Sequence, residues 1–282
     1  MILAPLRGVT IRCFRETFAD VIREAGFTEA VTPFIPAMSG VDPLKDRELK
    51  SSGRPEASGI RLTPQFIGKD PEALRASLRR IRSAGYDTAD LNCGCPFPMV
   101  RNKGRGSGLL RTPEVLRRML EVGCETMGPD KFSVKVRLGV DRNDELLELM
   151  PMINCFPLRF LTVHGRLARQ MYEGSCDTEM VARVTAAARV PVIANGDLPM
   201  PDVPRDDAMI GRAFVRYLGE RPDSRDLLRR YVAASRVELC GDRPVLGRMK
   251  ELLSYWKDIP AWSRKWPVVK ICRTVDELCT LI

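Results

Sequence analysis

Short apolar segments alternate with amphipathic segments along most of this chain, and this alternation limits the possible folds more than any other feature. Strands that alternate with helices pair in parallel, because each connection must cross back over the sheet. Eight such strands close into a barrel, so the sequence predicts an α/β fold, a (β/α)8 TIM barrel. The predicted strands are residues 2–5, 30–34, 60–67, 86–91, 132–138, 160–163, 190–194 and 207–210.

Helices are expected between most of these strands. Their predicted ranges are residues 11–25, 71–84, 113–127, 144–152 and 178–188. The connection at residues 197–206 contains three prolines and leaves little room for a crossover helix, because proline interrupts helical hydrogen bonding. Residues 40–54 are polar and charged, which is typical of a long surface loop.

The alternation ends near residue 220, so the chain is expected to divide into a barrel, residues 1–220, and a small helical domain, residues 221–282. In the second part, residues 223–239 and 245–257 have helical spacing, and residues 268–271 are compatible with a short strand. Basic and aromatic side chains are mixed there. That mixture is typical of nucleic-acid-binding surfaces and also of ordinary amphipathic bundles.

The charge balance favours an anionic partner. The formal net charge is +9 and the pI is near 9.2, which makes nucleic acid the leading candidate, although an arginine-rich lineage would give the same values. No apolar run reaches the ~20 residues of a membrane span. Residues 1–5 are too short for a signal peptide and read as a first strand. We therefore expect a cytoplasmic protein without a membrane segment.

Nine cysteines are scattered along the chain. An odd number without a secretory signal favours reduced thiols over a disulfide framework. Cys93 and Cys95 are separated by one residue, and no Cys or His cluster elsewhere completes a zinc pattern. A metal site is therefore not expected.

Residues 90–96, Asp-Leu-Asn-Cys-Gly-Cys-Pro, are the strongest candidate for chemistry. The glycine and proline cannot continue a strand, which is expected to stop at Asn92 and to deliver an amide and two thiols to the rim where barrels carry their sites. On an exposed turn, Cys95 could donate a proton, with Cys93 as the competing thiol; a small buried hydrophobe is the alternative. A mobile, basic, glycine-rich loop is expected at residues 97–108.

Three other strand ends carry polar side chains. Lys135 and Arg137 share one face of a strand, and such a face needs a flavin, a phosphate, or a buried carboxylate such as Asp90. His164 is the only histidine, and it is either a structural residue or part of a site at the rim. Gln65 ends the third strand, where its amide is expected to form hydrogen bonds either with the backbone or with a planar heterocycle.

The ends of the last two strands contain glycine. Residues 195–197 read Asn-Gly-Asp, and residues 211–212 read Gly-Arg. Barrels commonly bind phosphate at this place, through backbone N–H groups and a helix N-terminus. Each end alone is compatible with a plain turn, but the pair predicts a phosphate site.

Taken together, these motifs resemble the tRNA-dihydrouridine synthase family. The resemblance rests on Leu3-Ala4-Pro5-Leu6, Asp90-Leu91-Asn92-Cys93-Gly94-Cys95-Pro96, Lys135-Val136-Arg137-Leu138-Gly139, Val163-His164-Gly165-Arg166, Val192-Ile193-Ala194-Asn195-Gly196-Asp197 and Met209-Ile210-Gly211-Arg212. In the helical domain, Gly247-Arg248-Met249-Lys250 and Leu253-Ser254-Tyr255 look most like the branch that contains the bacterial synthase C. The family usually has methionine at the position of Leu6 and a different loop after Cys95.

The resemblance implies an FMN-binding barrel and a helical tRNA-binding domain that grip tRNA between them. NADPH would reduce the flavin, which would reduce the C5=C6 bond of a D-loop uridine, at position 16, and Cys95 would give the proton to C5. The product would be 5,6-dihydrouridine. The uridine must be turned out of the folded RNA to reach the cofactor. We expect the protein to be a monomer.

The same resemblance assigns roles to individual residues. Those expected at the cofactor are Ala4, Pro5 and Leu6 against the flavin ring, Gln65 at its pyrimidine edge, Lys135 at the reduced ring, His164 beside ring or phosphate, and Asn195, Gly196, Asp197, Gly211 and Arg212 at the phosphate. Those expected at the substrate are Asn92 and Arg137, with Arg101, Lys103 and Arg105 facing tRNA phosphates. Two alternatives are a flavin barrel that acts on a free pyrimidine or another small molecule, and a tRNA-binding protein without catalysis.

Overall fold

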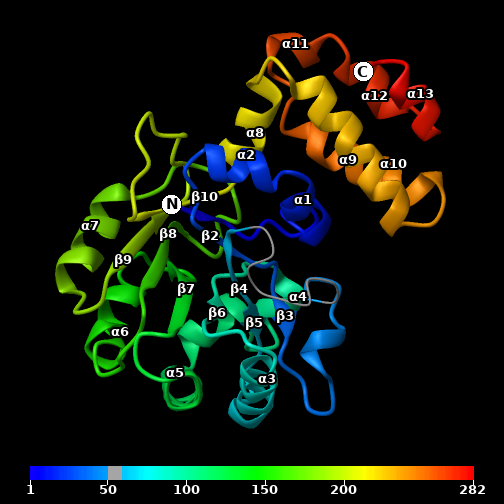
Figure 1. The fold of residues 1–282 in the computed structure, drawn as a ribbon. Coiled ribbons are helices and arrows are strands. Elements are labelled where there is room, and N and C mark those ends of the chain that lie inside the picture. Colours follow the sequence, from blue (N-terminus) through cyan, green and yellow to red (C-terminus); the bar gives the residue numbers. More distant parts are fainter. Residues whose placement is uncertain (50–58) are drawn as a thin grey trace.

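The centre of the molecule is a parallel sheet curled into a barrel (Figure 1). The computed structural model describes residues 1–49 and 59–282, and in these residues ten short strands pair in the order β3-β5-β6-β7-β8-β9-β10-β1-β2-β4. Their bounds are β1 (Ile2–Leu3), β2 (Glu29–Val31), β3 (Ile35–Pro36), β4 (Arg61–Thr63), β5 (Gln65–Ile67), β6 (Ala89–Cys93), β7 (Phe132–Gly139), β8 (Leu161–Leu167), β9 (Val192–Asn195) and β10 (Ala208–Ile210). Each of the eight strands expected in the barrel overlaps one of them.

The ten strands fill eight positions around the barrel, because two positions are each split into two short strands. β4 and β5 are separated only by Pro64, which lacks the backbone donor of a continuous strand. β2 pairs with β4 and β3 pairs with β5, so both ends of the sheet meet on this broken strand. Thr32 bridges the break: its N–H donates to Thr63 O and its hydroxyl accepts from the Gln65 N–H, both at 3.0 Å. The predicted TIM barrel is confirmed.

Helices cover the outside of the barrel. They are α1 (Arg12–Thr17), α2 (Ala19–Glu24), α3 (Pro71–Ser83), α5 (Pro113–Met127), α6 (Glu145–Ile153), α7 (Thr178–Ala187) and α8 (Arg212–Glu220). Local sequence explains where they start. For α3, the Asp70 carboxylate accepts from the N–H groups of Glu72 and Ala73, and Pro71 takes the first helical position. No helix lies between β9 and β10, as the prolines there predicted.

Two expectations about the first half of the chain are wrong in detail. The predicted helix at residues 11–25 is two helices, because the backbone turns at Phe18 and keeps its ring in the core. The predicted loop at residues 40–54 contains a short 3-10 helix at Pro43–Lys45 and the buried Glu48. Part of that prediction, residues 50–54, lies outside the described residues.

Three expectations about later segments are also corrected. β6 does not stop at Asn92 but includes Cys93. Residues 97–108 are not an open loop: they form α4 (Pro98–Arg101) and part of the 3-10 helix η2 (Gly106–Arg111), which is largely buried. Residues 268–271 belong to a helix, α12 (Trp266–Ile271), with a proline in its first turn. A half-buried strand would bury alternate residues, whereas this segment buries Val269 alone.

The helical part after residue 220 shares a hydrophobic core with the barrel. Its helices are α9 (Ser224–Glu238), α10 (Asp242–Ser254), α11 (Pro260–Ser263), α12 and α13 (Val275–Cys279), and Figure 1 shows α9 and α10 on the side of the barrel that carries α1 and α8. One continuous cluster of buried side chains joins Phe14 of α1, Phe214 of α8 and Tyr231 of α9. The Trp256 indole N–H donates to Val215 O at 2.6 Å. The two predicted domains are therefore packed together through apolar contacts.

None of the helices in the described residues has both the length and the apolar character needed to cross a bilayer. Within the same part of the chain, no three His, Cys, Asp or Glu side chains come together as a potential metal site.

Candidate active site

A cavity of about 770 Å³ opens at the carboxyl-terminal ends of the strands, where barrel sites are expected. Its wall is built by residues that follow β1, β6 and β10 and by side chains of β7, β8 and β9. Glu251 and Tyr255 of the α10 region also line it, so the cavity lies between the barrel and the helical part. Thirteen of the predicted site residues line this one cavity: Ala4, Pro5, Leu6, Gln65, Asn92, Cys95, Lys135, Arg137, His164, Asn195, Gly196, Gly211 and Arg212.

The turn that carries Cys95 is fixed by one side chain. Oδ1 of Asn92 accepts from the N–H of Gly94 at 3.2 Å and from the N–H of Cys95 at 2.9 Å. From the other side, the N–H and hydroxyl of Ser107 donate to Cys95 O at 3.1 and 2.9 Å. The turn was expected to be exposed, but Cys95 is only 6% exposed because η2 covers it. Burial raises the pKa of its thiol, which therefore stays protonated at neutral pH.

Strand alternation separates the two thiols. Asn92 points into the barrel and lines the cavity, whereas Leu91 and Cys93 point outward into the core beneath the helices. Cys93 is fully buried, and burial raises its pKa well above the usual value. The structure thus separates the thiols that the sequence left in competition: Cys95 reaches the cavity and Cys93 does not.

The turn after β1 is shaped by Thr10, a residue that the sequence did not single out. Its hydroxyl accepts from the Leu6 N–H at 2.7 Å and donates to Ala4 O at 2.9 Å. Because both bonds tie the turn to the segment just before α1, Pro5 and Leu6 form a fixed apolar part of the cavity wall.

Lys135 is a half-buried cation in the cavity wall. Its Nζ donates to Asn195 Oδ1 at 2.7 Å, and the amide of Asn195 donates to Met209 O at 2.8 Å. Burial lowers the pKa of Lys135 to about 7. An ion pair with Asp90 was one alternative for this lysine, but the Asp90 carboxylate is hydrogen-bonded to Gln65 and Ser133. The charge of Lys135 is thus available to interact with a ligand.

Arg137 lies farther out on the same strand and faces the thiol side of the cavity. Its guanidinium donates to Gly94 O and Leu167 O, both at 2.9 Å, and lies 5.4 Å from the ring centre of Tyr172. Burial lowers its pKa to about 10, so it remains charged at neutral pH. The backbone of the Cys95 turn is therefore tied to a cation as well as to Asn92.

His164 has an unused polar atom. The side chain is 7% exposed, and its Nδ1 has no hydrogen-bond partner among the described residues. Burial lowers its pKa, and the positive charges of Lys135 and Arg137 lower it further, so the imidazole is neutral. A buried polar atom without a partner inside a cavity is the expected signature of a ligand contact.

The far end of the cavity is bounded by Gly196, Gly211 and Arg212. Asp197 does not line it. Its carboxylate instead pairs with Arg166 at 2.6 Å and Arg212 at 2.8 Å. Partial burial would raise the pKa of Asp197, but the hydrogen bond and charge of Arg166 bring it below its usual value. Any part that Asp197 has in binding an anion therefore runs through these two guanidinium groups. Arg166 belongs to a recognised motif but was not itself assigned a role.

The three basic residues expected at RNA lie beside the cavity rather than in its wall. Arg101 and Arg105 are half-buried and Lys103 is exposed, all on the segment that follows Cys95. The exposed Met99 and Tyr172 line the mouth nearby. This arrangement leaves the rim both basic and apolar.

Sequence reasoning missed several cavity residues. Arg7, Phe34, Tyr172, Glu251 and Tyr255 line the mouth although none was assigned a role. Arg7 lies over the ring of Phe34, 5.5 Å from its centre. The one available signal was the resemblance that included Tyr255 in the helical part, but nothing local indicates that α10 faces the barrel.

The wall chemistry suits a large planar ligand with a negative charge. Lys135, Arg137 and Arg212 supply positive charge, and the amides of Gln65 and Asn92 supply oriented hydrogen bonds. The volume is in the range of cofactor sites. The unpartnered Nδ1 of His164 and the glycines at one end fit the same kind of ligand.

Comparison with known proteins identifies the family. The family model described as dihydrouridine synthase (Dus) matches residues 2–212. The chain belongs to the dihydrouridine synthase family. Membership makes it an oxidoreductase of the dihydrouridine synthase type, and it agrees with the resemblance found in the motifs.

Several curated relatives are similar to this chain. tRNA-dihydrouridine synthase B of Vibrio cholerae is 32% identical over 75% of this chain and 66% of its own length. The tRNA-dihydrouridine(16) synthases of Shigella flexneri and Escherichia coli K12 are each 29% identical, over 90% of this chain and 88% of their own length.

Solved structures confirm the fold. The old yellow enzyme homologue from Zymomonas mobilis has a TM-score of 0.55 at 11% identity and covers 77% of this chain and 85% of its own. Morphinone reductase in complex with tetrahydroNAD has a TM-score of 0.53 at 12% identity and covers 79% and 89%. At these identities the likeness concerns the barrel architecture alone.

Proposed function

We propose that this protein is a tRNA-dihydrouridine synthase that binds FMN, takes electrons from NADPH and reduces the C5=C6 bond of a D-loop uridine. The observation that carries the proposal is the cavity itself: the protonated thiol of Cys95 and the cation of Lys135 line the same cavity. A reduction that needs both a proton donor and a charged cofactor requires such an arrangement.

FMN would lie across the cavity with its phosphate at Gly196, Gly211 and Arg212 and its ring between the Ala4–Leu6 turn and the interior side chains. When bound, FMN supplies the two-electron reduction, with NADPH as the source of electrons. Gln65 would bond the pyrimidine edge, Lys135 would stabilise negative charge on the ring, and His164 would use its free Nδ1. Asp197 would hold Arg166 and Arg212 at the phosphate.

Cys95 would give the proton to C5 of the uracil. Its raised pKa keeps the thiol protonated, and η2 keeps bulk water away from it. After the transfer, the nearby Arg137 would stabilise the thiolate until it regains a proton. Asn92 would orient the base, using the N–H that its contact with Gln65 leaves free.

The RNA would approach over the rim that Arg101, Lys103 and Arg105 surround, and the uridine would turn out of the folded tRNA into the cavity. α10 would form the opposite side of the RNA site, since Glu251 and Tyr255 line the mouth. The net charge of +9 favours such a partner. We expect a monomer that acts in the cytoplasm.

Position 16 of the D-loop is our choice for the modified uridine. Relatives named tRNA-dihydrouridine(16) synthase from Shigella flexneri and Escherichia coli match 90% of the chain, whereas the Vibrio cholerae synthase B matches 75%. The longer match supports a shared helical part, which is the part that would set the orientation of the tRNA.

The test is reconstitution. Purified protein is loaded with FMN and mixed with NADPH and a tRNA that lacks dihydrouridine, and the nucleosides are measured by mass spectrometry. We expect dihydrouridine, and sequencing of the product should place it at position 16. A protein that binds no FMN contradicts both flavin readings. Reduction of free uridine, but not of tRNA, would point to the small-molecule alternative.

A further inference from the structure

The carboxylate of Asp90 lies buried beneath the cavity, and no function has been assigned to it above. Asp90 of β6 is fully buried inside the barrel and does not line the cavity. Its Oδ1 accepts from Gln65 Nε2 at 2.7 Å and its Oδ2 from the Ser133 hydroxyl at 2.7 Å. Gln65 Oε1 in turn accepts from Asn92 Nδ2 at 2.8 Å, and Asn92 Oδ1 holds the Cys95 turn. We name the series Asp90–Gln65–Asn92–Cys95 the amide relay.

The direction of the amide relay follows from its first member. An ionised carboxylate only accepts hydrogen bonds, so Gln65 must present its NH2 group to Asp90. Its oxygen then faces Asn92, which must present its own NH2 group. The oxygen of Asn92 is thereby left for the backbone N–H groups of the Cys95 turn. Without an acceptor of fixed sense at the start, either amide could rotate by 180° and reverse the series.

We infer that Asp90 is a positioning residue that sets, through Gln65 and Asn92, which amide atoms face the cavity and where the Cys95 thiol lies. The inference rests on the proposed function for its catalytic meaning. One carboxylate would then fix two parts of the site: the amide at the flavin edge and the turn that holds the proton donor.

The surroundings of Asp90 argue against a role in fold stability alone. Burial raises its pKa to about 6, so the ionised form is costly to keep inside the barrel. Two charged groups act on it, Lys135 from β7 and Glu29 from β2, and neither is bonded to it. Glu29 is paired with Arg159 at 2.6 Å, and Lys135 donates to Asn195. Apolar residues of similar volume would stabilise the barrel at least as well.

The key variant is Asp90→Asn, which keeps the size of the side chain but can present either an oxygen or an NH2 group to Gln65. Ser133→Ala is the matched control, because it removes a hydrogen bond from the same carboxylate and leaves the relay intact. For Asp90→Asn we expect kcat for tRNA to fall about 10- to 100-fold with KM little changed, as for a misplaced reacting group. Alkylation of Cys95 by iodoacetamide, followed by peptide mass spectrometry, should accelerate on the order of tenfold as the turn loosens.

A second variant repositions the carboxylate. In the double variant Asp90→Asn, Gln65→Glu, the new glutamate accepts from residue 90 and from the NH2 group of Asn92, so the orientation of Asn92 is restored. We expect the Cys95 alkylation rate to return to the wild-type value while the flavin absorption spectrum stays altered, because the amide at the flavin edge is gone. A change in packing alone would not be reversed by this second substitution.

The inference is overturned if folded Asp90→Asn matches wild type in kcat and alkylation, or if Ser133→Ala falls as far as Asp90→Asn does. If Asp90→Asn does not fold, the double variant decides: a folded protein with the wild-type alkylation rate supports the relay, and a different rate or a failure to fold refutes it. Alkylation needs no reaction with RNA. A wild-type protein that makes no dihydrouridine therefore refutes the proposed function, while the alkylation rates still report on the relay.

Discussion

The Nζ of Lys135 on β7 and the Oδ1 of Asn195 on β9 are joined by a hydrogen bond of 2.7 Å across the barrel mouth. The bond skips β8, which lies between the two strands in the sheet. It places the half-buried ammonium group of Lys135 beside a neutral partner, so the hydrogen bond does not cancel its positive charge. An incoming anion would meet that charge with little competition.

The first prediction concerns pH. Burial lowers the pKa of Lys135 to about 7, so the lysine is charged below that pH and neutral above it in the free protein. An anionic ligand favours the charged form. FMN affinity should therefore fall as the pH rises from 7 to 9, by up to about tenfold per unit if Lys135 alone responds. Fluorescence titration of FMN measures this slope. Lys135→Met, which keeps roughly the length of the side chain, should abolish the pH dependence.

The lowered pKa of Lys135 also predicts how the stability of the apo-protein changes with pH. The folded pKa lies below the unfolded value of about 10.4, so folding disfavours the charged lysine. Without FMN, the contribution of Lys135 to stability should be least favourable below pH 7 and should improve as the pH rises toward 10. Lys135→Met should consequently stabilise the apo-protein at pH 6 more than at pH 9, as urea unfolding would show. An equal effect at both pH values would contradict the assigned pKa.

The second prediction separates the two thiols. Cys95→Ala should lower dihydrouridine formation about 10²- to 10⁴-fold, the usual contribution of a general acid, and should leave FMN binding unchanged. Cys93→Ala is the matched control, since Cys93 points into the core. It should reduce thermal stability but keep most of the activity of the folded enzyme. If a mass-spectrometric assay shows the opposite pattern, Cys93 and not Cys95 is the proton donor.

The third prediction concerns Asp197, which pairs with Arg166 and Arg212. If its role is to orient these guanidinium groups, Asp197→Asn should weaken FMN binding about tenfold, because the arginines lose their charged partner. If the carboxylate merely lay near the phosphate, its removal would relieve repulsion and tighten binding. The exposed Asp202 of the same connection provides the control, and Asp202→Asn should leave the dissociation constant unchanged.

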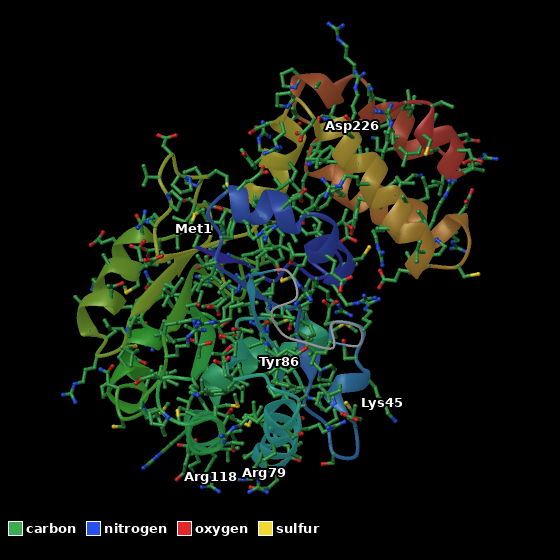
Figure 2. The ribbon with its side chains drawn as sticks, viewed as in Figure 1. Met1, Lys45, Arg79, Tyr86, Arg118 and Asp226 are labelled. Atoms are coloured by element: carbon green, nitrogen blue, oxygen red, sulfur yellow. The ribbon has the colours of Figure 1, made fainter. Side chains whose placement is uncertain are left out.

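The fourth prediction concerns RNA. Lys103→Ala should weaken tRNA binding and reduce the slope of log K against log salt by about one, because one phosphate contact is lost. Arg79→Ala is a control of equal charge: Arg79 is exposed on α3, and Figure 2 shows it at the end of the molecule away from Asp226 and the helical part. Both variants should bind FMN normally. Equal losses in tRNA affinity would mean that charge acts without regard to position.

Much of the barrel could be predicted from the sequence because its information is local. The alternation of apolar and amphipathic segments located the strands, and the three prolines at residues 197–206 predicted the missing helix. The phase of β6 was less certain. Only the structure shows that Asn92 faces inward and Cys93 outward. A strand end with two cysteines does not reveal which of its side chains face the barrel interior.

What could not be predicted depends on partners far apart in the chain. Gln65 and Asp90 lie 25 residues apart, and Arg166 and Asp197 lie 31 apart, so neither contact leaves a local pattern. The helix α12 was misread as a strand because a short apolar run has no decisive period. Glu251 and Tyr255 reach the cavity only through the docking of α10, which local sequence does not encode.

The apolar contacts that join the barrel to its helical part have a practical consequence. Gly219 of α8 lies so close to the Trp256 indole that a methyl group there would come within 2.5 Å of it, and Phe14 and Tyr231 meet edge to face. Removing residues 221–282 would leave this surface bare, so a shortened chain would aggregate before its affinity for RNA could be measured. Calorimetry of the whole chain should show a single melting transition, and neither part should be transplantable as an independent module.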